Sequence, residues 1–487
     1  MKTLQKRLLR YSAAKSHYIR SGITRSHLNK IIKQAKNLKS LNFKGECGLS
    51  NFKGIRRIRN LQDLSVRVTT KVILKYPQLF KRLTSLKKVR LYITWFKKNY
   101  QNKTLKKFFE SVVNLPNLQH LTIWLDEGFH HFKWLGGDVF YYKTLLAAMH
   151  KAKIPSFEVV VCSTFEHQNS SNSQIDWGNY IDTLYIGEIG WLKYQDGGSN
   201  GWPLATEPER RLRLNVPLSS SKMDKLVSQS MTIKNLTVKH LFGKDKNYEI
   251  KDAKSFLTFI SQVKTLENLN LALDAEYEND CVFVSALNQE FMKIESLESL
   301  RTFTLDFSSQ SQRIPASSPP YGKIMKNLRT LSLRIWGDHF ELLSWTEGLE
   351  DLVSLENFNF EYKESIPYST RESLDCNFPF EQLQNLKSIR LNCNLPFSKN
   401  SREHLVKSLL EVENLVSLKI EGEILGGLTK KKASEFVENL SGKKDLGVAS
   451  FSWKAARSLR WTEVKINRNV DGKITLSSEH KQREPAF

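Results

Sequence analysis

The stretch from residue 114 to residue 125, NLPNLQHLTIWL, carries the pattern that decides the fold. Its apolar residues change from a spacing of three to a spacing of two, at Leu115, Leu118, Leu121, Ile123 and Leu125. Steps of two are typical of a strand with one buried face, and the preceding steps of three indicate a short loop that leads into it. We therefore expect a strand whose first inward-pointing residue is Leu121. The equivalent residue of every such unit is called the pivot.

The same unit recurs along most of the chain. Fourteen pivots, 23 to 36 residues apart, can be followed: Leu41, Leu64, Val89, Leu121, Phe157, Leu184, Leu212, Leu236, Leu269, Phe303, Leu331, Phe358, Ile389 and Leu418. A last, degenerate unit is expected at Val464. Apolar residues at helical spacing predict helices in several of the intervals, at 103–113, 253–263 and 402–412. A fixed unit repeated this often predicts stacked repeats around a continuous core.

This pattern resembles the leucine-rich repeat family, whose motif is LxxLxLxxN/C, over roughly residues 38–425. The longer intervals are most similar to the ribonuclease-inhibitor-like class. The resemblance implies an α/β solenoid, a curved horseshoe with a parallel β-sheet on the concave face and helices on the convex face. The chain departs from the family at the asparagine or cysteine that follows the strand, because only Asn394 matches that position. We therefore expect an irregular array without the family's buried asparagine ladder.

Four regions are expected along the chain. They are a basic N-terminal cap helix or arm, the repeat array, a C-terminal cap and a flexible polar tail, at residues 1–37, 38–428, 429–466 and 467–487. The C-terminal cap should contain a helix at KKKASEFVENL. Three inserts rich in Gly, Pro, Ser or aromatic residues interrupt the array, at 127–142, 190–209 and 308–322, and are expected on the surface.

Composition limits the classes and the cellular locations that can be expected for this protein. No apolar run approaches the roughly 18 residues that a membrane helix needs. Five cysteines are scattered without CxxC spacing, which is typical of reduced thiols in an intracellular protein. A cytoplasmic location is expected. A mitochondrial one is the alternative, because no acidic residue precedes Glu46 and an acid-free, Arg-containing N-terminus is typical of a transit peptide.

The positive charge is concentrated at one end. The chain has a formal net charge of +24, yet residues 1–109 contain 29 Lys and Arg and only two acids, Glu46 and Asp63, which makes +27. The remaining residues therefore carry about −3. A field localised in this way indicates an acidic partner, which is an acidic protein, a nucleic acid or an anionic membrane surface.

The sequence holds little that indicates catalysis. It has no HExxH, GxGxxG, P-loop, GxSxG or paired CxxC motif. Its Asp and Glu residues form no acid/base pair that the spacing would favour. We therefore expect that the protein is not an enzyme and that it holds no metal site and no cofactor.

The candidate site is the face that the strands present away from the core. In each strand this face holds the residues one before, one after and three after the pivot. In the basic half they include cations, a histidine and two aromatics: Lys44, Arg67, Lys88, Arg90, Tyr92, His120 and Trp124. Such a mixture suits an acidic protein surface, and it also suits phosphate contact combined with base stacking. A protein–protein scaffold with an acidic partner is the favoured hypothesis. An RNA or ribonucleoprotein component and a ubiquitin-ligase substrate receptor are the alternatives.

Overall fold

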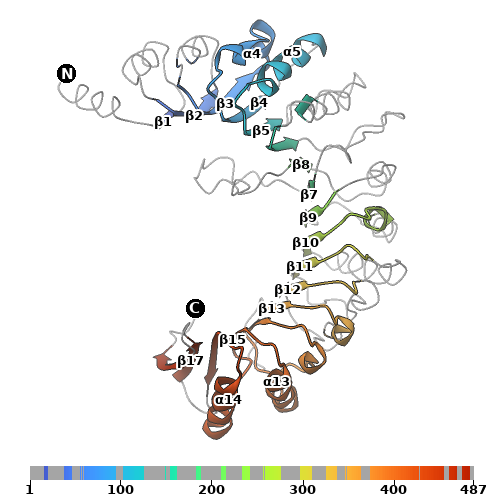
Figure 1. Cartoon of the computed structure of the whole chain (residues 1–487), viewed down its shortest axis with the longest axis vertical. Coiled ribbons are helices and arrows are strands. Elements are labelled where there is room, and N and C mark those ends of the chain that lie inside the picture. Colours follow the sequence, from blue (N-terminus) through green and yellow to red (C-terminus); the bar gives the residue numbers. More distant parts are fainter. Residues whose placement is uncertain are drawn as a thin grey trace, which may run out of the picture. The chain divides into compact units, whose positions relative to one another are not determined.

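The structure is a computed structural model of the whole chain. It describes residues 16–19, 38–46, 55, 58, 60–94, 102–125, 148–149, 154–161, 182–187, 210–214, 233–241, 256, 258–275, 297–309, 325–336, 346, 348–363, 373–426, 428–454, 460–468 and 474–482. Two compact units are present. Unit 1 comprises Met1–Pro217 and Ser228–Ile233, and unit 2 comprises Leu218–Val227 and Lys234–Phe487. Each is mixed α/β and is built on a parallel sheet of many strands (Figure 1).

Unit 1 contains eight described strands and three short helical elements. They are β1 (Ser16–Ile19), β2 (Ser40–Glu46), β3 (Asp63–Thr69), α4 (Thr70–Lys75), η1 (Leu79–Arg82), β4 (Lys88–Thr94), α5 (Asn102–Val113), β5 (His120–Leu125), β6 (Ser156–Val161), β7 (Thr183–Gly187) and β8 (Arg210–Leu214). From β1 to β6 each strand pairs in parallel with the next along the chain. β8 then lies between β6 and β7, parallel to both, so the spatial order departs from the sequence order at this point.

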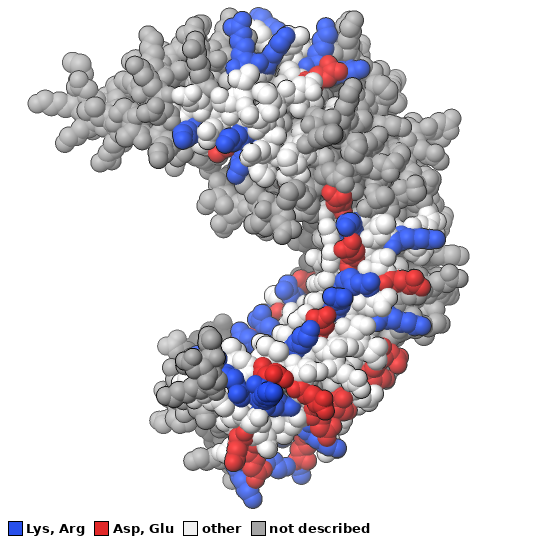
Figure 2. Space-filling model, viewed as in Figure 1, with Lys and Arg blue, Asp and Glu red and all other residues white. Residues whose placement is uncertain are grey.

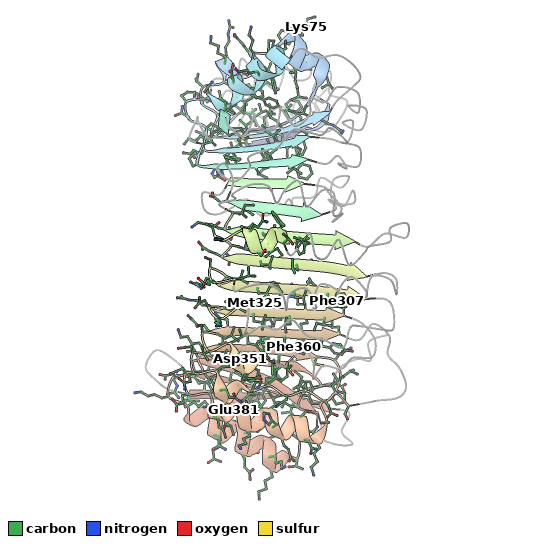
Figure 3. The ribbon with its side chains drawn as sticks, turned by 90° about the vertical axis from the view of Figure 1, so that its right-hand side faces the viewer. Lys75, Phe307, Met325, Asp351, Phe360 and Glu381 are labelled. Carbon is green, nitrogen blue, oxygen red and sulfur yellow. The ribbon has the colours of Figure 1, made fainter. Side chains whose placement is uncertain are left out.

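Unit 2 continues the same construction. Its elements are β9 (Asn235–Leu241), β10 (Asn268–Ala275), β11 (Thr302–Ser309), β12 (Thr330–Trp336), η3 (Leu349–Asp351), β13 (Asn357–Lys363), η4 (Phe380–Gln382), β14 (Ser388–Cys393), α13 (Lys399–Glu411), β15 (Ser417–Gly422), α14 (Lys430–Gly442), β16 (Val448–Lys454), β17 (Arg460–Arg468) and β18 (Ile474–Gln482). Strands β9 to β16 lie side by side in chain order and are all parallel (Figure 3). β17 and β18 then add two antiparallel strands.

The fourteen predicted strands are present as β2 to β15. In most neighbouring pairs the pivots lie opposite one another, as in Leu64 with Val89 and Leu331 with Phe358. The exception is the β6–β8 pair, in which Val159 rather than Phe157 faces Leu212. A shift of two residues keeps every side chain on its own face of the sheet, because side chains alternate with a period of two.

Backbone hydrogen bonds join each repeat to the one before it. The carbonyl two residues before a pivot accepts from two consecutive N–H groups of the next repeat. Lys39 accepts from Gln62 and Asp63 at 2.7 and 2.9 Å, and Arg329 accepts from Glu356 and Asn357 at 2.8 and 2.9 Å. The loop that enters each strand is thereby tied to its neighbour, which satisfies backbone groups outside the sheet ladder.

The core is formed by the pivots and by the other strand residues that point to the same face of the sheet. β13 shows the alternation, since Phe358, Phe360 and Tyr362 are buried and the residues between them are more exposed. Aromatic rings extend this core in unit 2, where Phe378 and Phe380 stack at 5.2 Å. The helices predicted at 103–113, at 402–412 and at KKKASEFVENL correspond to α5, α13 and α14. In the interval predicted at 253–263, Phe256 and residues 258–262 are helical.

The C-terminal region differs from expectation. Residues 474–482, expected in a flexible tail, form β18 and pair with β17, so that prediction is wrong there. Val464 is not the pivot of a parallel repeat, because β17 runs antiparallel to β16. The last parallel strand is β16, whose pairing places Ala449 opposite Leu418. The small residue at the pivot concealed this strand from the apolar pattern.

At the N-terminus, residues 16–19 of the region expected as a basic cap helix or arm form a strand, β1, which pairs with β2. The other residues of the cap lie outside the described residues. So do the inserts at 127–142 and 190–209, and so does most of the third insert. Of the cysteines, Cys376 and Cys393 are described. Both are buried, and neither forms a disulfide with another described residue.

Candidate partner-binding surface

The strand face of unit 1 is formed by three rows of side chains that run across neighbouring strands. Strand pairing places Asp63, Lys88, His120 and Ser156 in the first row. The second row holds Ser65, Arg90, Thr122 and Glu158, and the third holds Arg67, Tyr92, Trp124 and Val160. Six of the seven predicted site residues therefore lie on adjacent strands, in one patch of the face. All six are half-buried, so each presents part of its side chain at the surface.

Lys44 is not in register with this patch. Sequence spacing placed it beside Arg67, but the pairing of β2 with β3 shifts between Asn42 and Glu46, so Glu46 is the residue opposite Arg67. The extra residues on β2 include Gly45, which is a residue type often found at a bulge. Lys44 therefore lies out of register with the third row, because the pairing of β2 with β3 is irregular at this point.

Tyr92 and Trp124 form an aromatic pair in the third row. Their ring centroids lie 5.7 Å apart, at an interplanar angle of 41°. Burial raises the pKa of the Tyr92 hydroxyl, Arg90 opposes that rise, Glu158 adds to it, and a hydrogen bond with Ser65 acts against it. The tyrosine is thus packed into the face and held by its neighbours. It contributes a fixed apolar surface more than a free ring for stacking.

The pKa of His120 is affected by the charged residues of the first and second rows. Burial lowers its pKa below the ordinary value of 6.5, and the positive charge of Lys88 lowers it further. Asp63 opposes this shift, and Arg90 adds to it. The neutral form of the imidazole is therefore favoured relative to that of a free histidine, and an anion brought to this face would favour protonation.

The strand face of unit 2 is different in character, because its charges compensate one another. Glu361 lies 2.7 Å from Lys363 and 3.9 Å from Arg334, and Glu421 lies 2.9 Å from Lys419 and 3.3 Å from Arg390. Burial raises the pKa of Glu361, but the hydrogen bond and charge of Lys363 outweigh it, and the pKa is lowered.

Uncharged side chains on the unit 2 face also pair across strands. The Asn359 amide donates to the Ser332 hydroxyl at 3.0 Å, and the Asn357 amide donates to the Thr330 hydroxyl at 3.3 Å. The unit 2 face is thus largely occupied with its own contacts, which makes it a weaker candidate for a charged partner.

A ladder of asparagine side chains occurs at a position that the repeat motif does not predict. Four residues before the pivot, an asparagine amide donates to a backbone carbonyl of the preceding repeat at 2.8 to 3.0 Å, in Asn117–Thr84, Asn327–Glu298, Asn385–Val353 and Asn414–Gln384. The recurring NLxxΦ, where Φ is the apolar pivot, was the available signal. The ladder is on the entry side of the strand, whereas the family motif places its asparagine on the exit side.

Other kinds of site find no support in the part of the chain that the structure describes. It contains no group of three or more His, Cys, Asp or Glu side chains that could hold a metal ion. None of the described helices is long and apolar enough to cross a membrane.

Comparisons with known proteins add no assignment. No model of a known protein family matches the chain. A search of curated proteins also found no match.

Proposed function

We propose that the chain is a leucine-rich repeat protein, and that it acts as a non-enzymatic scaffold whose strand face in unit 1 binds an acidic partner protein. The repeat assignment is supported by the recurring unit, by the pivots that lie opposite one another and by the hydrogen bonds that join successive repeats. A stacked array of this kind presents an extended face with many independent contacts. Fold alone does not define a function, so the proposal depends on the residues of that face.

The observation that carries the proposal is the group of Arg67, Lys88 and Arg90 on two adjacent strands, bordered by Tyr92 and Trp124. Adjacent strands lie about 4.8 Å apart, so carboxylates on one partner segment would reach several of these cations at once. Arginine and large aromatic residues are the types that contribute most to protein interfaces.

A nucleic acid is the second candidate for this face, because a cation next to an aromatic ring suits stacking and phosphate contact. Two features favour a protein instead. Tyr92 is packed and hydrogen-bonded, and the face also holds the carboxylates of Asp63 and Glu158, which would repel phosphates. A protein partner, in contrast, can present both signs of charge.

The test compares two triple variants of the intact chain. In the first, Arg67, Lys88 and Arg90 are replaced by Gln. In the control, the same number of strand-face cations in unit 2, Arg334, Arg390 and Lys419, are replaced by Gln. Both variants are used for capture from native extract at low and moderate salt, and the bound material is analysed for protein and RNA.

We expect the first variant to lose an acidic protein that the control and the unaltered chain retain. Retention of the same partner by both variants would show that the strand face of unit 1 is not the binding surface. Loss of RNA alone would favour the second candidate.

A further inference from the structure

The helical layer of unit 1 carries a second basic surface. α4 and η1 each pack against α5, and α4 also packs against β3 of the sheet. Five exposed cations lie on these elements: Lys75, Lys81, Arg82, Lys106 and Lys107. Figure 2 shows Lys and Arg side chains gathered over these elements, and Figure 3 places Lys75 on α4. We call these five residues the helical basic patch.

The charge of the helical basic patch is not balanced locally. Among the described residues of α4, η1 and α5, the only carboxylate is Glu110, which is half-buried. None of the five cations forms an ion pair within 4.0 Å with another described residue, although Lys106 and Glu110 have the favourable helical spacing. Five like charges on adjoining elements repel one another, so their proximity costs folding free energy.

The helical layer of unit 2 provides an internal comparison. There Lys407 lies 3.7 Å from Glu411, and Lys431 lies 3.9 Å from Glu435. Lys432 of α14 also reaches Glu403 of α13 at 2.6 Å. Among the described residues, α13 and α14 of unit 2 therefore carry several paired charges, whereas the five cations on the unit 1 helices are unpaired. Solubility alone does not require that difference.

The chemistry of the patch distinguishes between possible ligands. Phe80, Phe108 and Phe109 of η1 and α5 are buried in the core, so these three rings offer no aromatic anchor at the surface of the patch. Protein interfaces are depleted in lysine and depend on buried aromatic or arginine anchors, whereas contact with a phosphate backbone needs only positive charge.

We propose that the helical basic patch binds the phosphate backbone of a nucleic acid without reading its sequence. This surface is separate from the strand face, and the inference does not depend on the function proposed for that face. Unit 1 would then contact a protein through its strands and a nucleic acid through its helices.

The proposal predicts a measurable salt dependence. For a single strand, the logarithm of the binding constant falls with the logarithm of the salt concentration, with a slope of about −0.7 for each phosphate contacted. If three to five cations of the patch are engaged, the patch contributes about −2 to −3.5 to the slope. Removing one phosphate contact should therefore reduce the magnitude of the slope by about 0.7.

The experiment uses the full chain and labelled poly(U) RNA. The test variant replaces Lys81, Arg82, Lys106 and Lys107 with Glu. The matched control makes the same change in net charge at four exposed, scattered lysines of unit 2: Lys264, Lys326, Lys399 and Lys444. Circular dichroism melting is used to check that both variants fold. A labelled poly-glutamate peptide and vesicles of anionic phospholipid are measured in parallel.

We expect the test variant to lose at least about tenfold in RNA affinity and most of the salt slope, while the control retains both. RNA binding that is unchanged in the test variant would overturn the proposal. So would patch-dependent binding of poly-glutamate or vesicles without RNA binding. The strand-face triple variant described above should bind RNA normally, so failure of the proposed protein interface and failure of this one give different results.

Discussion

Two glycines, Gly348 and Gly422, adopt a left-handed backbone conformation. Gly348 and Gly422 both have positive φ, of 79° and 83°, a region that other residues rarely adopt. Their surroundings differ. A Cβ on Gly348 would meet nothing within 4 Å, whereas one on Gly422 would run into the backbone carbonyl of Cys393. Gly422 ends β15, where the chain passes close to the end of β14.

Replacing the two glycines with alanine should therefore have unequal effects. Gly348→Ala should lower the free energy of unfolding by about 1–2 kcal/mol, since only the left-handed backbone is penalised. Gly422→Ala should cost at least about twice as much, because the new methyl group also displaces the backbone between two strands. Urea unfolding of both variants checks this. Equal losses would indicate that the β14–β15 contact relaxes freely.

His120 gives a pH-dependent prediction. Burial, Lys88 and Arg90 lower its pKa below 6.5. The folded state therefore binds the proton less readily than the unfolded chain. This contribution to stability is fully present above pH 6.5 and is lost as the pH falls through the folded-state pKa.

Nuclear magnetic resonance titration should find the His120 pKa below 6.5 and should find it raised in Lys88→Gln. Lys87→Gln is the control, because Lys87 is exposed, lies next to Lys88 and is not among the causes of the shift. An acidic partner bound to the strand face should also raise this pKa. If the His120 pKa is the same in Lys88→Gln as in the unaltered chain, the charge of Lys88 is not a cause of the shift.

Hydrogen bonds between the loops of successive repeats hold neighbouring strands and their loops together. The asparagine four residues before the pivot joins its loop to the loop of the preceding repeat, in addition to the backbone bonds. Because these side chains are exposed, water competes for the same groups, and each bond should contribute at the lower end of the usual range. The ladder repeats, so its total effect exceeds that of any single residue.

Asn385→Ala and Asn414→Ala should each lower the free energy of unfolding of unit 2 by about 0.5 kcal/mol, the lower end of the usual range. Gln384→Ala serves as the control, because it removes an exposed side chain from the same loop but keeps the carbonyl that accepts from Asn414. Chemical denaturation monitored by tryptophan fluorescence gives the values. A loss in the control equal to that in the asparagine variants would mean that the ladder has no special role.

At the scale of the whole molecule, the two units differ in electrostatics. Almost all of the net charge of +24 belongs to unit 1, because residues 1–109 alone carry +27. Unit 2 holds several paired charges on its strands and helices. Repulsion between like charges weakens as salt shortens the screening length, from about 30 Å at 0.01 M to about 8 Å at 0.15 M.

Added salt should therefore stabilise unit 1 and leave unit 2 nearly unchanged. Hydrogen exchange read by mass spectrometry follows peptides of both units in one sample, at low and at physiological salt. Slower exchange at higher salt is expected in β3 to β5 and not in β13 to β15. The same response in both units would argue against uncompensated charge as the distinguishing property of unit 1.

The positions of the strands from β2 to β15, and the excess of positive charge in the first 109 residues, could be predicted from the amino-acid sequence alone. So could the grouping of Arg67, Lys88, Arg90, Tyr92 and Trp124 on one patch of the strand face. These features follow from local periodicity, because a strand with one buried face needs an apolar residue at every second position.

Three features could not be predicted and are seen only in the folded chain. They are the irregular register at Lys44, the place of β8 between β6 and β7, and the antiparallel strands at the C-terminus. The structure also showed which charges pair, so that the unit 2 faces are balanced and the helical basic patch is not. The physical reason is that pairing joins residues that are distant in sequence. Local periodicity specifies which way a side chain points, but it does not specify which residue of another segment lies opposite.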